Sequence, residues 1–413
     1  MSLAPGVLAI DGGDLPLGGG LLALIRPALS LLDEGGVLAL LSRNGDLDQD
    51  LPTWCRAERH EYLGAEAAGD AHRHLIGRGK VPHRHDDMAQ PEPLHPRDPL
   101  PTFGRLPSLP MPDRADTASG FAPRGTAVEA GGPAYPFDLV ERDHVAPPDI
   151  AALYDQAIAA QWNASRDIPW DKVKTHTPEI DAAIRQIMTF LAENELLALY
   201  LPSKFISRIH PAYVEVAMFL ATQLQDEARH IEVFLRRARM ASGLAVSSVA
   251  TSRSLLSLLQ LQDFSESAFL LSVLGEGTFL DLLAFIERYA PDEATAELVR
   301  RARNDESRHV HFGLMHVRHA LAHDRSLYRR LEDAVRLRAT TLAGISSVPA
   351  PVQDALTILA AGGTEQENVS RGHAAFRELL DTMHHSRIKR LLHAGFTPQQ
   401  AETISTLHTP NFM

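Results

Sequence analysis

One short phrase occurs twice in the sequence, and this repeat limits the possible folds more than any other feature. Asp226–His230 reads D-E-A-R-H and Asp305–His309 reads D-E-S-R-H. Glu195 lies 32 residues before the glutamate of the first copy, and Glu276 lies 30 residues before the glutamate of the second. Two Glu-x-x-His pairs and two further glutamates, each on its own helix, predict a dinuclear metal site inside a four-helix bundle.

Helical spacing places these side chains on apolar helix faces. The apolar residues that precede them in steps of three and four are Ile184, Met188 and Leu191 for Glu195, Val216 and Leu220 for the first motif, and Phe269 and Val273 for Glu276. Residues in such steps share one face of a helix. A buried carboxylate without a partner is costly, so four that converge indicate bound cations.

The candidate metal ligands are therefore four glutamates and two histidines: Glu195, Glu227, His230, Glu276, Glu306 and His309. A glutamate and a histidine three residues apart project to the same side of a helix, so both can reach one ion. Glu193 is the alternative to Glu195, but a separation of two residues puts it on another face. The competing interpretation of the whole pattern is two sets of surface ion pairs.

Clusters of proline and glycine divide the chain into three predicted parts. Residues 1–78 are expected to form a small α/β unit of order βαβαββ, which is typical of a two-layer sandwich. Residues 79–145 include a proline-rich stretch with few β-branched residues, so they are expected to be a linker. Residues 146–413 predict almost continuous helix, so the fold class is mostly α: a four-helix bundle with extra C-terminal helices.

Breaks in this helical part follow from particular residues. The first core helix is expected to start at Pro178 and to end near Leu201, because Pro202 interrupts it. A serine-rich connection around 247–254 is expected between the second and third core helices. The fourth core helix is expected over about 292–322.

Charge and cysteine content exclude several classes of function. The formal net charge is −12, and no dense cluster of Lys and Arg reverses it, so nucleic acid is not expected as a partner. Cys55 is the single cysteine, which excludes an intrachain disulfide and indicates a reducing, cytoplasmic location. No basic segment precedes the apolar N-terminus, and we find no run of about 18 uncharged apolar residues. Neither a signal peptide nor a membrane partner is therefore expected.

Within the first part, Leu51–Arg56 (L-P-T-W-C-R) and His60–Leu63 (H-E-Y-L) resemble the small TusA-like sulfur-carrier family. That family carries its reactive cysteine in a C-P-x-P motif after the first strand. The corresponding place here reads Leu15-Pro16-Leu17-Gly18, and leucine cannot carry a persulfide. The resemblance implies a domain that keeps the fold without the chemistry. Cys55 is expected to be a buried helical residue, and a reactive thiol is the alternative.

From about 150 to 325, the duplicated motif resembles the ferritin-like dinuclear oxidases and oxygenases. These include hydroxylases of bacterial multicomponent monooxygenases, ribonucleotide reductase small subunits and the p-aminobenzoate N-oxygenase. The resemblance implies that the six candidate residues are metal ligands. It also implies a crossed arrangement, in which Asp226 orients His309, Asp305 orients His230, and Arg229 and Arg308 neutralise the two aspartates. The alternative for these Asp/Arg pairs is ordinary pairing on a helix surface.

Two departures narrow the resemblance. Ribonucleotide reductase small subunits commonly place a radical tyrosine four residues after the first ligating histidine, where this chain has Phe234. The N-oxygenases add a third histidine one turn before the second ligating glutamate, where this chain has Ala302. His316 is a candidate for an extra ligand, but two helical turns put it about 10 Å from His309 along the helix.

The sequence thus predicts an O2-activating non-haem di-iron oxidase or monooxygenase that acts on a small organic substrate by hydroxylation, N-oxygenation or desaturation. Its cofactor is expected to be two Fe ions, with a Mn/Fe pair as the alternative. The expected partners are the substrate, O2, an unidentified electron donor and a second copy of the chain in a homodimer. The competing functions are a ferroxidase that handles iron and a Mn/Fe oxidase that binds a ligand.

Overall fold

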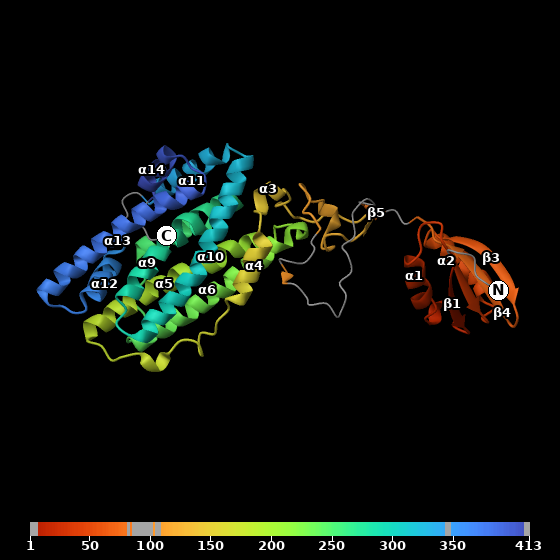
Figure 1. Cartoon of the computed structure of the whole chain (residues 1–413), viewed down its shortest axis with the longest axis horizontal. Helices are drawn as coiled ribbons and strands as arrows, with labels where there is room; N and C mark the ends of the chain where they lie inside the picture. Colours follow the sequence, from red (N-terminus) through yellow and green to blue (C-terminus); the bar gives the residue numbers. More distant parts are fainter. Residues whose placement is uncertain (1–6, 81–82, 85–101, 104–108, 343–347, 409–413) are drawn as a thin grey trace. The chain divides into compact units, whose positions relative to one another are not determined.

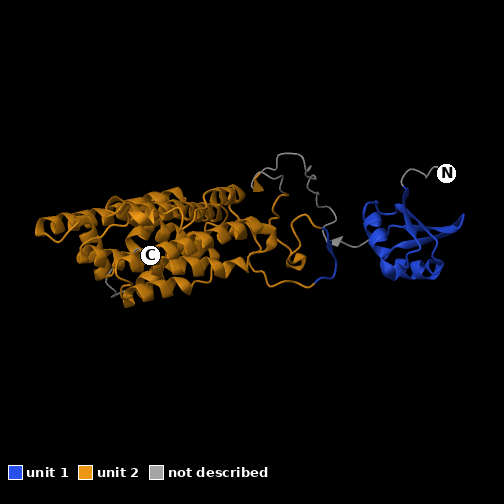
Figure 2. Ribbon diagram, turned by 90° about the horizontal axis from the view of Figure 1, so that it is seen from below, with its two compact units in different colours: residues 1–88, 127–132 blue, residues 89–126, 133–413 orange. Residues whose placement is uncertain are grey.

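A computed structural model of the chain describes residues 7–80, 83–84, 102–103, 109–342 and 348–408. The chain divides into two compact units, residues 1–88 with 127–132 and residues 89–126 with 133–413 (Figure 2). The first is a small α/β unit and the second is helical (Figure 1). The expected fold class, mostly α with a helical bundle preceded by a small α/β sandwich, is confirmed.

The α/β unit has the predicted order βαβαββ. Its elements are β1 (Val7–Gly13), α1 (Leu22–Ser30), β2 (Val37–Ser42), α2 (Leu47–Ala57), β3 (Glu61–Ala68) and β4 (Ala71–Gly77). The sheet order is β1-β2-β4-β3, with β1 parallel to β2 and the other pairs antiparallel. A second, two-stranded sheet pairs β5 (His83–Arg84) with β6 (Val128–Glu129).

One hydrophobic core joins this sheet to both helices. Leu38 and Leu40 lie on the same face of β2 and pack with Ile25 of α1 and Leu51 of α2. Cys55 belongs to the same core and is fully buried, as expected. Burial raises the pKa of its thiol to about 11, so the thiolate that a persulfide carrier needs is suppressed at neutral pH.

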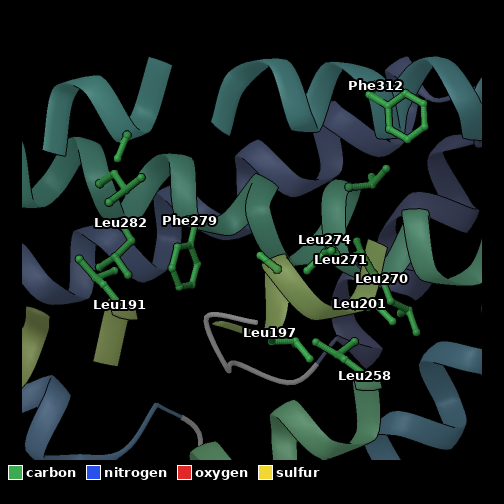
Figure 3. Packing of buried hydrophobic residues seen from close by; sticks show 14 of the residues in the cluster. Leu191, Leu197, Leu201, Leu258, Leu270, Leu271, Leu274, Phe279, Leu282 and Phe312 are labelled. Carbon is green, nitrogen blue, oxygen red and sulfur yellow. The ribbon is translucent and has the colours of Figure 1, made fainter. Parts of the chain in front are cut away.

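Four long helical segments form the bundle of the second unit. They are α5 (Pro178–Ile206), α6 (Val214–Met240), a composite third helix and α10 (Glu293–His323). The composite helix consists of α8 (Phe264–Ala268), a π-helical segment η6 (Phe269–Glu276) and α9 (Gly277–Arg288). Helix α5 packs along α6, and α10 packs along α9 and η6. Figure 3 shows leucine and phenylalanine side chains of α5, η6, α9 and α10 in the shared core.

Helix ends follow from local chemistry, with two differences from expectation. Helix α5 begins at Pro178 as expected, and the Thr177 side chain caps it by accepting a hydrogen bond from the backbone N–H of Ile180. Pro202 was expected to end this helix, but α5 continues to Ile206, because Leu201 and Phe205 on either side of it pack in the core and offset the hydrogen bond lost at the proline. The serine-rich connection contains α7 (Val249–Leu259), because Ser248 caps a leucine-rich stretch.

Part of the predicted linker packs against the helical unit. Residues 85–101 and 104–108 of that stretch lie outside the described residues. Beyond them, Phe137 and Val140 are buried in the helical core. The Tyr213 hydroxyl donates to the backbone carbonyl of Val140 at 2.7 Å, and Arg124 forms a nearly buried ion pair with Glu215. Regular structure is sparse here, so these tertiary contacts, rather than periodicity, place the segment.

Further helices surround the bundle. They are α3 (Arg142–Val145) and α4 (Ile150–Ala159) before it, and α11 (Leu327–Thr341), α12 (Ala350–Ala361), α13 (Gln366–His393) and α14 (Pro398–Leu407) after it. Helix α4 packs on α6, α12 on α5, and α13 on α9. Gly362 separates α12 from α13 and closes α12 in the left-handed conformation at φ 68°.

The composite third helix, Phe264–Arg288, is long and apolar enough to cross a membrane by length and composition. Of its most apolar window, 83% is buried inside the protein. Its apolar character therefore matches its place in the core, and this helix carries Glu276 into the bundle.

Candidate metal centre

The four bundle helices bring the six predicted ligands together at their centre. Each of the six side chains is at most 2% exposed. Their donor atoms form two groups, each with its atoms within 4.8 Å of one another: Glu195, Glu227, His230 and Glu306, and Glu227, Glu276, Glu306 and His309. Glu227 and Glu306 belong to both groups, so these two carboxylates could bridge two adjacent ions.

Each histidine lies at a distance from its neighbouring carboxylates that would allow all of them to bind one ion. His230 Nδ1 lies 3.1 Å from Glu227, 3.2 Å from Glu306 and 3.6 Å from Glu195. His309 Nδ1 lies 3.1 Å from Glu227 and 3.3 Å from Glu306. Ligands about 2.1 Å from one ion and at right angles to one another are about 3 Å apart. Each Nδ1 therefore stands where an imidazole ligand would stand.

The aspartates of the repeated motif determine which nitrogen faces the centre. His309 Nε2 donates to Asp226 at 3.2 Å, and His230 Nε2 donates to Asp305 at 3.2 Å. Each aspartate thus contacts the histidine of the other motif. Because the proton on Nε2 is used in this bond, the Nδ1 lone pair is free to ligate an ion.

The two arginines complete a closed charged ring with these aspartates. Arg229 contacts Asp226 and also Asp305, the latter at 3.3 Å. Arg308 contacts Asp226 at 3.1 Å and Asp305 at 2.5 Å. Positive and negative charges alternate around the ring, so two buried aspartates are neutralised without involving the ligands. These contacts tie the α6 motif to the α10 motif.

Burial and neighbouring charge shift the pKa values of the ligands in opposite directions. Burial raises the pKa of Glu195 and Glu276, and the nearby Glu306 carboxyl adds to the effect. Burial also acts to raise the pKa of Glu227, but the imidazoles of His309 and His230 outweigh it and lower the value. Raised pKa values mean that some of these side chains hold protons when no metal is bound. Binding of cations would replace those protons.

Unsatisfied polar atoms test whether metal ions fit the centre. Among the described residues, Glu195, Glu227, Glu276 and Glu306 each have one buried carboxylate oxygen with no hydrogen-bond partner. Such orphaned oxygens are rare in protein interiors, because desolvation costs free energy that nothing returns. Four carboxylates also balance the charge of two divalent ions. The residues therefore fit a dinuclear centre of oxygen and nitrogen ligands.

The geometry also places the residues that are alternatives at single positions. Glu195 points into the cluster, whereas Glu193 is half-buried and lies next to Ser247. His316 is buried away from the cluster, and its Nε2 bonds the Ser265 hydroxyl at 3.0 Å. Phe234 is fully buried with its ring centroid 6.3 Å from that of His230.

A narrow apolar pocket with a cavity volume of about 20 Å³ lies beside the centre, next to Gln223. Its lining comes from α5, α6, α8, η6 and α10 and is apolar except for three polar residues, Gln223, Ser267 and Ser272. Gln223 Nε2 donates to Glu276 Oε1 at 3.1 Å, so one side chain both lines the pocket and orients a candidate ligand. Thr278 of α9 does not line the pocket, and its hydroxyl donates to the carbonyl of Leu274 in η6.

Two site residues could not be found from sequence spacing. Trp162 donates its indole N–H to Asp305 at 2.7 Å, and Gln161 donates to Asp226 at 3.2 Å. Both follow the end of α4, and nothing in their local sequence relates them to motifs 65 and 143 residues away. Gln223, by contrast, lies on the apolar face that leads to Glu227 and could have been recognised there.

Comparisons with known proteins give limited information. No protein-family model matches the sequence, and no curated protein matches it. Solved structures of R2-like ligand-binding oxidases are similar to the chain. Two variants with a reconstituted Mn/Fe cofactor align at 19% identity with TM-scores of 0.46 and 0.45, covering 60% and 64% of this chain and 93% and 95% of theirs. At such scores the likeness says nothing of activity.

Proposed function

We propose that the helical unit holds a dinuclear Fe or Mn/Fe centre and catalyses an O2-dependent oxidation of a small, mainly apolar organic molecule. One observation carries the proposal: two overlapping ligand groups share Glu227 and Glu306, and four of their buried carboxylate oxygens lack hydrogen bonds. When bound, the metal pair supplies the electrons that activate O2.

The chain's own residues would hold and orient this centre. Asp226 and Asp305 keep a proton on Nε2 of His309 and His230 and so direct both Nδ1 atoms to the ions. The fully buried bundle core excludes water. Gln223 fixes one oxygen of Glu276 and leaves the other oxygen for an ion.

The pocket favours an organic substrate over iron handling. A ferroxidase needs a polar route for iron, whereas Leu201, Leu271 and Phe312 make this approach apolar. A monooxygenase reaction also needs an electron pair from a donor, because one oxygen atom enters the substrate and the other becomes water. We therefore expect O2 uptake to depend on both an organic substrate and a reductant.

The test measures metal content and O2 uptake of the full chain after loading with Fe(II), or with Mn(II) and Fe(II). About two ions per chain are expected, together with O2 uptake that an apolar substrate accelerates. Rapid uptake with Fe(II) alone, unchanged by any organic molecule, would assign the protein to the ferroxidases. A protein that binds neither metal would overturn the proposal.

Filling the pocket separates substrate binding from metal binding. Ala268 lines the pocket, so Ala268→Leu should lower substrate-dependent O2 uptake while the metal content stays at the wild-type value. Ala355→Leu is the matched control, since Ala355 is a buried alanine of α12 that does not line the pocket. Equal activity losses in the two variants would show that the pocket is not the substrate site.

A further inference from the structure

A second group of candidate ligands lies where α3 meets the C-terminal part of α10. His319 Nε2 is 3.5 Å from Asp143 Oδ1, and His323 Nε2 is 3.8 Å from Asp143 Oδ2. Donor atoms of these three side chains all lie within 4.8 Å of one another. His319 follows His309 by ten residues, or about 15 Å along a helix. The group is therefore separate from the centre described above.

The hydrogen bonding of His323 leaves a lone pair directed at Asp143. His323 Nδ1 donates to the backbone carbonyl of His319 at 2.9 Å, so this nitrogen carries the proton of the neutral ring. Nε2 is then unprotonated and faces a carboxylate oxygen. Metal-binding histidines commonly use one ring nitrogen in this way, because a bond to a backbone carbonyl fixes the tautomer.

His319 presents a second nitrogen in the same direction. Its side chain is 17% exposed, and its buried Nε2 has no hydrogen-bond partner among the described residues. The two rings stand one helical turn apart with centroids separated by 4.4 Å. Two imidazole nitrogens and a carboxylate thus converge, and a cation between them would satisfy all three.

Neither protonation of His319 nor pairing of Asp143 with an arginine accounts for this group as well as a bound cation does. Burial and the neighbouring His323 lower the pKa of His319, which disfavours an imidazolium there. Arg142 approaches Asp143 at 3.4 Å, but its shorter contact is with Asp113 at 2.8 Å. Asp143 therefore keeps carboxylate oxygen for another cation.

We propose that Asp143, His319 and His323 form a mononuclear site for a divalent transition-metal ion, with Zn²⁺ as the best fit. Two imidazoles and one carboxylate are ligands that Zn²⁺ favours, and three protein ligands leave a position open for water. Asp143 lies on α3, whereas both histidines lie on α10. The ion would therefore fasten the short α3 helix to the C-terminal part of α10.

The test compares Zn²⁺ binding by full-length variants that all keep the dinuclear centre. His323→Ala and Asp143→Asn should each bind one Zn²⁺ ion fewer per chain than the wild type, or bind that ion at least about tenfold more weakly. Equilibrium dialysis with metal analysis gives the number of ions, and calorimetry gives the affinity. Zn²⁺ should also raise the Tm of the wild type more than that of either variant.

His385→Ala is the matched control. His385 is exposed on α13, and its Nδ1 donates to the backbone carbonyl of Asp381, so it repeats the local bonding of His323 without its partners. This variant should bind Zn²⁺ as the wild type does. If His323→Ala and Asp143→Asn bind the same number of ions as His385→Ala with the same affinity, the proposed site does not exist.

Discussion

The two halves of the dinuclear centre have the same motif, but their lone glutamates, Glu195 and Glu276, which lie outside the repeat, have different surroundings. Glu195 lies on α5, a continuous α-helix, and approaches His230 to 3.6 Å. Glu276 is the last residue of the π-helical segment, accepts a hydrogen bond from Gln223 and lies on the side of the apolar pocket. The repeat therefore builds a nearly symmetric core, and the helices that carry the lone glutamates make it asymmetric.

This difference separates metal binding from substrate access. Asp226 and Asp305 give both histidines the same support, so both ion sites have similar anchors. A π-helical segment widens one turn and is frequent at functional sites. Here it occupies the helix that borders the pocket. We infer that the Glu195 side mainly holds its ion, while the Glu276 side is the one that admits substrate.

The largest expected effect comes from the two shared carboxylates. Glu227→Gln and Glu306→Gln should each abolish binding of both ions, because each residue belongs to both ligand groups. Glu195→Gln and Glu276→Gln should each leave about one ion per chain, since each belongs to one group. Metal analysis after dialysis gives these numbers, and circular dichroism confirms that the variants fold. Loss of both ions in Glu195→Gln would contradict the assignment of bridging and terminal ligands.

The next effect concerns the aspartates that orient the histidines. Asp226→Asn and Asp305→Asn should weaken metal binding by about 10–100-fold, because the amide no longer fixes the imidazole proton. The loss in Asp305→Asn should be larger, since the bond that Asp305 accepts from Trp162 is 2.7 Å long, whereas the one that Asp226 accepts from Gln161 is 3.2 Å long. Trp162→Phe removes only that bond and serves as the milder control. Equal affinities in Asp305→Asn and the wild type would show that the ring merely pairs charges.

The metal-free protein should become less stable as the pH rises. Burial raises the pKa of Glu195 and Glu276 above 4.5, the ordinary value for glutamate, and at His309 the neighbouring carboxylates outweigh burial and raise the pKa above 6.5. A raised pKa in the folded state stabilises the fold below the unfolded-state pKa, and the gain is lost as the pH rises through the folded-state pKa.

Metal ions reverse this trend, because they bind the deprotonated ligands more tightly at higher pH. The difference in Tm between metal-loaded and metal-free protein should therefore grow as the pH rises above 4.5, which is the ordinary pKa of a glutamate side chain. Differential scanning fluorimetry over a pH series measures it. A difference that stays constant with pH would mean that the ligands carry no extra protons without metal.

The ligand set could be predicted because its signal is local. Each Glu-x-x-His pair lies within one helical turn, and apolar steps of three and four residues orient Glu195 and Glu276. The same reasoning gave the βαβαββ order of the first unit, where proline, glycine and alternating burial mark the ends of elements.

The remaining features depend on contacts between distant residues. Trp162 reaches Asp305 across 143 positions, and no periodicity encodes that contact. Pro202 stays within α5 although local propensity predicts an end, because packing at both sides of the helix outweighs one lost hydrogen bond. The π-helical segment changes the number of residues per turn, but the apolar pattern of the sequence does not change there. The pattern therefore predicts an ordinary α-helix.

The smallest expected effect tests the π-helical segment itself. A Cβ on Gly313 of α10 would lie 2.7 Å from Ser272 Cβ and 3.3 Å from Val273 Cγ2, both in η6. Gly313→Ala should therefore push the segment away and cost about 1–3 kcal/mol of stability, partly offset by the better helix propensity of alanine. Substrate-dependent O2 uptake should fall while both ions remain bound.

Gly372→Ala provides the comparison. A Cβ on Gly372 would lie 2.3 Å from the Thr357 carbonyl oxygen, so this change crowds the contact between α12 and α13 and leaves η6 untouched. It should lower Tm at least as much as Gly313→Ala does but preserve turnover at temperatures where both variants are folded. If the two variants lose turnover equally, stability rather than the shape of η6 controls activity, and the functional asymmetry of the two halves must come from Gln223 and the pocket lining alone.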